Sequence, residues 1–129
     1  MKILGLKYIK ENYGDLTVLE SSQIPFQIKR VYWLTNNNYN QERGCHAHKS
    51  LKQIFLTIQG SARILLKYKN GDNQEINMTE TSGALYLENC IWKEILPTSN
   101  DYICCVLADQ DYNEEDYIRS LEEYYSYDE

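Results

Sequence analysis

Two histidines stand two residues apart in the segment Arg43-Gly44-Cys45-His46-Ala47-His48-Lys49, and the chain has no others. On a strand, side chains at positions i and i+2 project from the same face, so both imidazoles would point the same way. Imidazole changes protonation near neutral pH and is also a common metal ligand. The pair therefore predicts a proton-transfer or metal site, unless the strand faces solvent and both residues are only polar surface groups.

The following residues resemble the first motif of the cupin superfamily, which reads HxH, four residues, Glu, six residues, Gly. Here Gln53 stands at the Glu position, Gly60 at the Gly position, and Lys93 about where a second motif usually supplies another histidine. A divalent metal usually needs three or four His, carboxylate or thiolate ligands. Because an amide and an ammonium group replace two of these, we expect no metal and no cofactor, and we interpret the histidines as acid–base groups.

A wider match spans residues 24–124 and consists of six runs: Ile28–Trp33, Arg43–Lys49, Gly83–Leu87, Ile91–Glu94, Val106–Asp109 and Tyr112–Arg119. On these runs the chain resembles the dTDP-4-oxo-6-deoxyglucose 3,4-ketoisomerase family, although Lys93 replaces the histidine that the family often has after the tryptophan. The resemblance implies a dTDP-linked 4-keto-6-deoxy sugar as substrate. It further implies movement of the keto group from C4 to C3 through an enediol, in the biosynthesis of 3-amino-3,6-dideoxy sugars, by a homodimer.

The resemblance also implies roles for single residues. We assign removal of the C3 proton to His48 and an acid or hydroxyl-shuttle role to His46. Arg43 is expected to stabilise the enediolate oxygen, and Tyr32 to donate a hydrogen bond to a sugar oxygen. The expected substrate-binding residues are Arg30, Lys49 and Arg63 for the diphosphate, Gln53 from the cupin motif, and Trp92 for stacking, with Trp33 and Tyr86 as further stacking candidates. The three cationic residues have an alternative interpretation as solvated strand residues, and the three aromatic residues as core residues of strands.

The elements that must position these residues are short strands separated by turn signals. The pattern predicts strands at 26–34, 53–58, 62–68, 75–79, 84–88, 91–96 and 102–108, with further edge strands at 3–9 and 16–19. Only the C-terminus favours a helix, from about Glu114 to Tyr125, with Tyr117, Leu121 and Tyr124 on its buried face. We therefore predict a single all-β domain over residues 1–129, a cupin-type jelly-roll barrel with a short C-terminal helix.

Composition narrows the partners. A net charge of −6 argues against a nucleic-acid polymer, because backbone binding is driven by clustered positive charge. The apolar runs are too short to cross a bilayer and no secretory signal is visible, so we expect a cytoplasmic protein with no membrane partner. The four cysteines lack CxxC spacing and are expected to be reduced. Two alternatives remain: a non-catalytic cupin that binds sugar nucleotides, and a cupin epimerase that acts at C3 and C5 of the same substrates.

Overall fold

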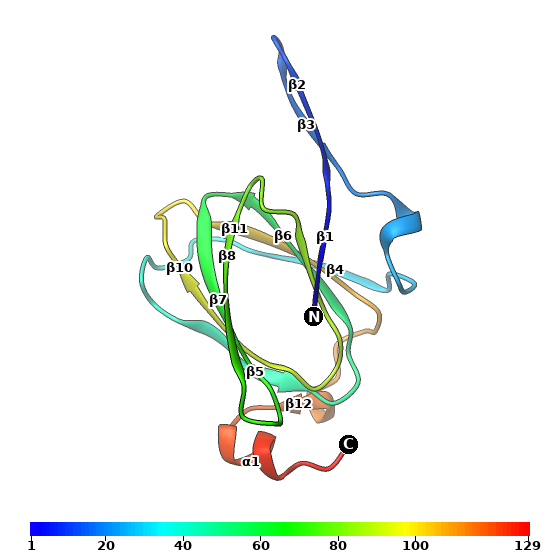
Figure 1. Ribbon diagram of the computed structural model, residues 1–129, viewed down its shortest axis with the longest axis vertical. Helices are drawn as coiled ribbons and strands as arrows, with labels where there is room; N and C mark the ends of the chain where they lie inside the picture. Colours follow the sequence, from blue (N-terminus) through cyan, green and yellow to red (C-terminus); the bar gives the residue numbers. More distant parts are fainter.

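The computed structural model describes residues 1–129, and most of its strands form two five-stranded antiparallel sheets around a common interior (Figure 1). The first sheet has the order β1 (Lys2–Leu4), β9 (Ala84–Leu87), β6 (Gln53–Gln59), β11 (Ile103–Ala108), β4 (Arg30–Leu34). The second has the order β12 (Tyr117–Ile118), β5 (Arg43–His48), β10 (Trp92–Pro97), β7 (Ser61–Lys67), β8 (Asn73–Thr79). The predicted all-β, two-sheet architecture is confirmed.

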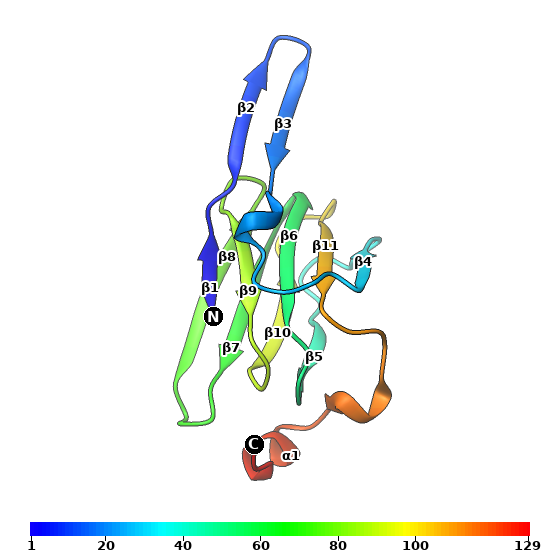
Figure 2. The ribbon, with the colours of Figure 1, turned by 90° about the vertical axis from the view of Figure 1, so that its right-hand side faces the viewer.

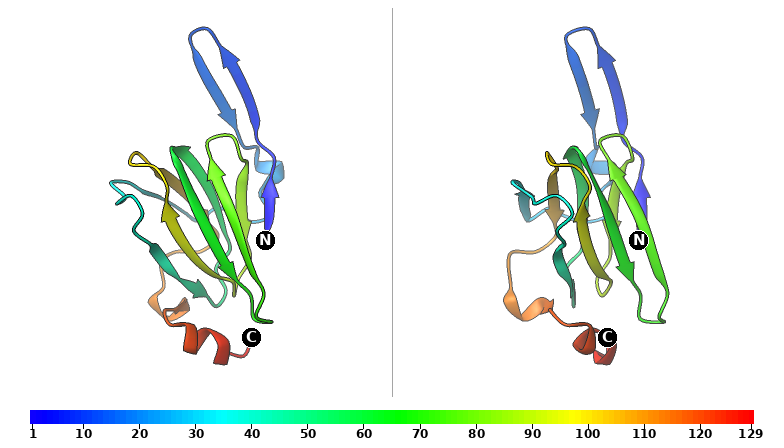
Figure 3. Two further views of the ribbon diagram at one scale, coloured as in Figure 1. Left: turned by 60° about the vertical axis from the view of Figure 1, so that its left-hand side comes forward. Right: turned by 90° about the vertical axis from the view of Figure 1, so that its left-hand side faces the viewer.

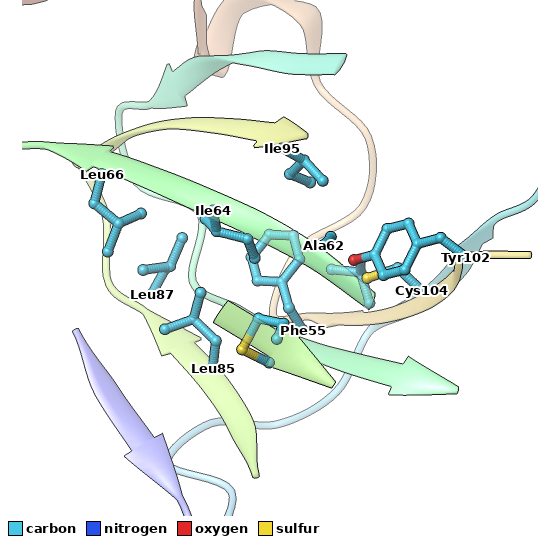
Figure 4. Close-up of a cluster of buried hydrophobic side chains, with 11 residues drawn as sticks. Phe55, Ala62, Ile64, Leu66, Leu85, Leu87, Ile95, Tyr102 and Cys104 are labelled. Atoms are coloured by element: carbon cyan, nitrogen blue, oxygen red, sulfur yellow. The ribbon is translucent and has the colours of Figure 1, made fainter. Parts of the chain in front are cut away.

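The core lies between the two sheets, where alternate residues of each strand point inward. On β7 the side chains of Ala62, Ile64 and Leu66 are buried, and on β11 those of Cys104 and Val106 are buried. These residues belong to one cluster of 11 buried side chains. Figure 4 shows most of this cluster, including Phe55, Leu85, Leu87, Ile95 and Tyr102. This packing fixes which face of each strand points toward the interior, and so decides which polar residues can share a site.

Gly60, the glycine of the cupin motif, has a steric reason to be there. It joins β6 to β7 with a φ of +76°, a conformation that residues with a Cβ rarely adopt. A Cβ at this position would also collide with the Ser99 side chain and lie 2.6 Å from Asp101 Oδ1. The turn therefore requires glycine, and it sets the register of two strands that build the interior.

A hairpin of β2 (Lys7–Glu11) and β3 (Gly14–Val18) projects from one end of the body, as Figures 2 and 3 show. The single edge strand expected at 3–9 is divided: β1 lies at the edge of the first sheet, whereas β2 pairs only with β3. A short 3-10 helix, Ser21–Gln23, follows the hairpin. The strand expected from Phe26 begins at Arg30 instead.

The C-terminal segment corrects the prediction of one helix from Glu114 to Tyr125. It contains a 3-10 turn (Glu114–Asp116), the short strand β12, and the helix α1 (Leu121–Ser126). Tyr117 and Ile118 pair with His48 and Ala47 of β5, and this sheet pairing overrides the helical pattern. Ser120 caps α1, because its hydroxyl accepts a hydrogen bond from the Glu123 amide. No helix in the structure is long and apolar enough to cross a membrane.

The buried residue of α1 is Tyr124, which is 0% exposed and donates its hydroxyl hydrogen to the carbonyls of Lys67 and Cys90. We expect Tyr124→Ala to lower the free energy of unfolding by about 3–5 kcal/mol, the usual cost of removing a large buried aromatic side chain. Tyr125→Ala is the matched control, because Tyr125 is the next residue of the same helix and is 48% exposed. Chemical denaturation measures both, and equal losses would show that α1 does not anchor on Tyr124.

Candidate active site

One cavity opens into the interior between β4, β5 and β10, with a volume of about 250 Å³. Its lining combines cationic, aromatic and apolar side chains: Arg30, Tyr32, Leu34, Arg43, Gly44, His46, Phe55, Lys93, Ile95 and Tyr117. Two arginines and a lysine line it and no carboxylate does, so the cavity favours an anionic ligand or a developing negative charge. The structure thus brings together four of the residues expected to act in the site, namely Arg30, Tyr32, Arg43 and His46.

The two histidines project from the same face of β5, and their ring centroids lie 4.9 Å apart in an edge-to-face arrangement. Tyr117 of β12 packs against both rings, at 4.9 Å from His46 and 4.5 Å from His48. They differ in access, because His46 lines the cavity whereas His48 is only 5% exposed and lies behind it. Of the two histidines, only His46 can contact a ligand in this cavity.

His48 is held by Asp116, which sequence reasoning missed as a site residue. The Nδ1 of His48 lies 3.0 Å from Asp116 Oδ2, while the amide and the hydroxyl of Ser50 each donate to Asp116 Oδ1 at 2.8 Å. With the carboxylate accepting from Nδ1–H, the lone pair of His48 is on Nε2, and that atom is buried without a hydrogen-bond partner. The only sequence signal was the position of Asp116 within the Tyr112–Arg119 match, where we interpreted it as part of a helix N-terminus.

Burial keeps both imidazoles neutral. Desolvation, followed by the charge of Lys93, lowers the pKa of His46 to about 2. The same two causes lower the pKa of His48 to about 4, although its hydrogen bond to Asp116 acts in the opposite direction. At neutral pH both rings therefore have a free lone pair that can accept a proton.

Lys93 lies directly opposite His46 in the β10–β5 pairing, and its Nζ is 2.9 Å from His46 Nε2. It is 3% exposed, and burial lowers the pKa of its ammonium group to about 7. Lys93, one of the two replacements that distinguish this sequence from the cupin motifs, therefore lies inside the site.

Tyr32 and Gln53 form a second polar pair. Gln53 is buried, and its side-chain amide donates to the Tyr32 hydroxyl at 2.7 Å. The Arg30 guanidinium lies 5.1 Å from the centre of the Tyr32 ring, and its Nε is buried without a hydrogen-bond partner. Burial raises the pKa of Tyr32, so its hydroxyl keeps its proton. Because that oxygen already accepts from Gln53, its own hydrogen is free to be donated toward the cavity.

Arg43 lies at the cavity mouth, and its position is fixed by neighbouring hydrogen bonds. Its Nη1 donates to Asn37 Oδ1 at 2.7 Å, and the Asn37 amide in turn donates to the Tyr102 carbonyl at 2.8 Å. Asn37 is buried, so this chain of contacts ties a charged side chain at the mouth to the core. The guanidinium is therefore preorganised rather than free in solvent.

Three residues expected to bind substrate lie elsewhere. Lys49 places its ammonium group 5.6 Å from the centre of the Tyr127 ring, and Arg63 pairs with Glu75 at 3.1 Å on the outer face of β7. Trp92 is buried against Tyr124 of α1. Strand alternation explains the last two, because their neighbours Ile64 and Lys93 point inward. Of the further stacking candidates, Tyr86 packs on Phe26 outside the first sheet and Trp33 is 66% exposed.

The donors at the cupin metal position do not fit a divalent cation. The Nε2 of His46 faces Lys93, the Gln53 amide is bonded to Tyr32, and Nδ1 of His48 is bonded to Asp116. A cation here would meet an amine and two guanidinium groups in place of carboxylate ligands. Fold and site together define a cupin with two neutral histidines in its interior and without the ligand set of a divalent metal.

Comparison with known proteins agrees with this class. The family model described as FdtA, WxcM-like, C-terminal, matches residues 1–129. The TDP-4-oxo-6-deoxy-alpha-D-glucose-3,4-oxoisomerase of Aneurinibacillus thermoaerophilus is 36% identical over 127 residues, which are 98% of this chain and 91% of that protein. The chain belongs to the FdtA family, and its resemblance to the sugar 3,4-ketoisomerases is confirmed.

Solved structures extend the likeness to three dimensions. QdtA, a sugar 3,4-ketoisomerase from Thermoanaerobacterium thermosaccharolyticum crystallised with TDP, superposes with a TM-score of 0.88 at 35% identity over 96% of this chain and 90% of its own. A crystal structure of a histidine-to-asparagine mutant of QdtA holds TDP-4-keto-6-deoxyglucose. WlaRB, a TDP-quinovose 3,4-ketoisomerase from Campylobacter jejuni, gives a TM-score of 0.87 at 35% identity over 96% of this chain and 95% of its own. The fold is therefore that of the cupin-type ketoisomerases.

Proposed function

We propose that this protein is an isomerase that converts dTDP-4-keto-6-deoxyglucose into the 3-keto sugar. The relatives that are 35–36% identical over nearly the whole chain are named for this chemistry, and a structure of one of them holds this substrate. The observation that carries the proposal is the neutral imidazole of His46, which lines a cationic cavity together with the Tyr32 hydroxyl.

The central step is removal of the C3 proton, which the C4 carbonyl makes acidic. We assign this step to His46, in place of His48, because a carbon base must touch the substrate and only His46 lines the cavity. As the C3–H bond breaks, its electron pair forms the C3=C4 bond and the carbonyl pair moves onto O4. Return of a proton to C4 then gives the 3-keto product.

Negative charge on O4 requires stabilisation, and the cavity supplies it from fixed donors. Arg43 is held at the mouth by Asn37, and Arg30 has a buried Nε without a partner. Such preorganised donors stabilise an enediolate without reorienting during the reaction. One of these two guanidinium groups is enough for O4. The other remains for the diphosphate, because an arginine can grip two phosphate oxygens at once.

A hydroxyl proton must also move from O3 to O4, and Tyr32 is placed to carry it. Its oxygen accepts from Gln53, its hydrogen is free for the substrate, and burial holds its pKa high enough to keep it a donor. In this account Gln53 acts on the substrate through Tyr32. His48 positions the ring of His46 through their edge-to-face contact, and Asp116 holds His48 in turn.

The product indicates the next reaction and the location of the enzyme, and the exposed apolar residues indicate its oligomeric state. A 3-keto sugar is the substrate that an aminotransferase needs to make a 3-amino-3,6-dideoxy sugar, and such chemistry on activated sugars belongs in the cytoplasm. The outer face of the first sheet exposes Val31, Trp33 and Ile58, each at least 50% exposed, which supports a homodimer formed on this face. Light scattering that returned the mass of one chain would contradict the dimer.

The test is to incubate the protein with dTDP-4-keto-6-deoxyglucose in the presence of a chelator and to follow the sugar by ¹³C NMR. We expect the ketone carbon to move from C4 to C3 at a rate that the chelator does not change. Binding without any change in the sugar would identify a non-catalytic binding cupin. Inversion at C3 or C5 with the ketone still at C4 would identify an epimerase, and restoration of lost activity by one divalent ion would overturn the metal-free mechanism.

A further inference from the structure

Lys93 has no role in the mechanism above, yet it is the polar group in closest contact with the proposed base. Its Nζ lies 2.9 Å from His46 Nε2 and 5.5 Å from the centre of the Phe55 ring. The direct pairing of residues 93 and 46 across β10 and β5 fixes this contact through the backbone, so it does not depend on a flexible loop. Nδ1 of His46 has no hydrogen-bond partner in the protein and remains for the substrate.

A buried lysine is normally paired with a carboxylate, but this one is not. The titratable and charged groups that face it come from four neighbouring strands: His46, His48 and Arg43 on β5, Arg30 and Tyr32 on β4, Cys104 on β11, and Tyr117 on β12. The thiol of Cys45, on the outer side of β5, also acts on the Lys93 charge through the strand. None of them is an acid that is charged at neutral pH. Desolvation therefore dominates and lowers the pKa of Lys93 to about 7, so that a large share of the enzyme has a neutral amine beside His46.

We propose that Lys93 acts through His46 as the final acceptor of the substrate proton, so that the His46–Lys93 pair, and not the imidazole alone, is the base of the isomerisation. This inference rests on the proposed function. It resolves a difficulty in that function, because desolvation and the charge of Lys93 lower the pKa of His46 to about 2, and such an imidazole acting alone is too weak a base to remove a proton from carbon effectively. Coupling to a neutral amine gives the pair the basicity of the amine.

The step balances without any other reagent. Nδ1 of His46 takes the C3 proton while the proton on Nε2 passes to the neutral Lys93 amine. His46 therefore stays neutral, Lys93 becomes an ammonium group, and the enediolate holds the negative charge. In the second half the ammonium returns its proton to Nε2, Nδ1 delivers a proton to C4, and the O3 proton moves to O4.

A covalent role for the same amine does not fit the product. An imine between Lys93 and C4 would, after the proton shift, leave the nitrogen joined to C4 as a secondary amine beside the new C3 ketone. That carbon–nitrogen bond cannot be released by hydrolysis, and the product needs oxygen at C4. The amine therefore acts as a proton acceptor and not as a nucleophile.

The first test needs no turnover. In the free enzyme labelled with ¹³C-lysine, the side-chain carbon next to Nζ of Lys93 should titrate near pH 7, and His46 should remain neutral throughout that range. Replacing Lys93 with Met should remove this signal and raise the pKa of His46, because the neighbouring positive charge is gone. A Lys93 signal that stays protonated above pH 9 would overturn the proposal, whether or not the proposed substrate is correct.

The second test compares Lys93→Met, Lys93→Arg and the exposed control Lys29→Met in the isomerase assay. In the wild type, kcat/KM should rise with pH to about 7 and then level off, because only the neutral amine accepts a proton. Lys93→Met and Lys93→Arg should each lose about 10²-fold or more in kcat while still binding dTDP, because neither side chain is a proton acceptor. The acid limb near pH 7 should be absent from both, and Lys29→Met should keep the wild-type profile.

The Lys93→Arg variant distinguishes a proton acceptor from a residue that only donates a hydrogen bond or supplies positive charge. If Lys93 only donated a hydrogen bond to His46 or supplied positive charge, Lys93→Arg would retain turnover close to wild type, and that result would overturn the proposal. Loss of a buried charge should leave Lys93→Met folded. A wild-type protein that does not convert the sugar would refute the proposed function alone, because the lysine titration stands independently.

Discussion

His46→Asn should lose about 10²–10⁴-fold in kcat while the protein folds normally and still binds dTDP, because general base catalysis contributes a factor of this size. Asparagine keeps a polar side chain of similar reach at the cavity wall but cannot take a proton from carbon. The loss should appear in kcat and not as weaker binding, since Arg30, Tyr32 and Arg43 keep their places in the lining. Steady-state kinetics together with calorimetry of dTDP binding measures both quantities.

The adjacent Cys45 provides the control for this variant. It is on the same strand with its side chain exposed outside the cavity, so Cys45→Ser should retain wild-type kcat. Near-normal turnover of His46→Asn would remove His46 from the reaction and return the role of base to another residue of the site. A loss confined to dTDP affinity would mean that His46 positions the nucleotide sugar and is not its base.

Asp116→Asn should lower kcat by about 10–10²-fold, the usual cost of removing a carboxylate that orients a functional histidine. The asparagine amide can donate to Nδ1 of His48, which would move the ring proton to Nε2 and remove the free acceptor beside His46. Its carbonyl oxygen can still accept from Ser50, so the turn should persist. ¹⁵N NMR of the imidazole reports the tautomer, and the isomerase assay reports the rate.

Glu115→Gln is the matched control, because it removes an exposed carboxylate from the same 3-10 turn. It should leave both the tautomer and kcat unchanged. If Asp116→Asn changed the tautomer of His48 but not the rate, then His48 would be a structural residue without influence on His46. If neither changed, the hydrogen bond between His48 and Asp116 would not determine the ring orientation.

Much of the fold could be predicted from the sequence, because alternating apolar residues and turn glycines are local signals. Ala62, Ile64 and Leu66 specify an inward face of β7 whatever their partners are. The sequence predicts a C-terminal helix that is too long, because the helical spacing of Tyr117, Leu121 and Tyr124 carries no information on strand pairing. Tyr117 joins a sheet whose partner strand lies about 70 residues earlier, and that contact is not local.

The site was predictable where residues share one strand and face. The spacing of His46 and His48, and of Arg30 and Tyr32, follows directly from strand alternation. The same rule could have corrected one error, because Trp92 and Lys93 are neighbours and cannot both face the interior. What the sequence could not provide were the pairs formed across the fold, His48 with Asp116 and His46 with Lys93. Those pairs depend on strand register, because a shift by one residue would move a side chain from the interior face of a strand to its outer face.

Deuterium incorporation from heavy water tests the central claim most directly, namely that His46 removes the C3 proton. The sugar is incubated in deuterated water with wild-type protein, His46→Asn or His48→Asn, and the hydrogens at C3 and C4 are followed by NMR. The account predicts deuterium at C4 of the product and exchange at C3 of the substrate with the wild type, reduced but detectable exchange with His48→Asn, and none with His46→Asn. Exchange at C3 that persists in His46→Asn and disappears in His48→Asn would contradict the account and return the role of carbon base to His48.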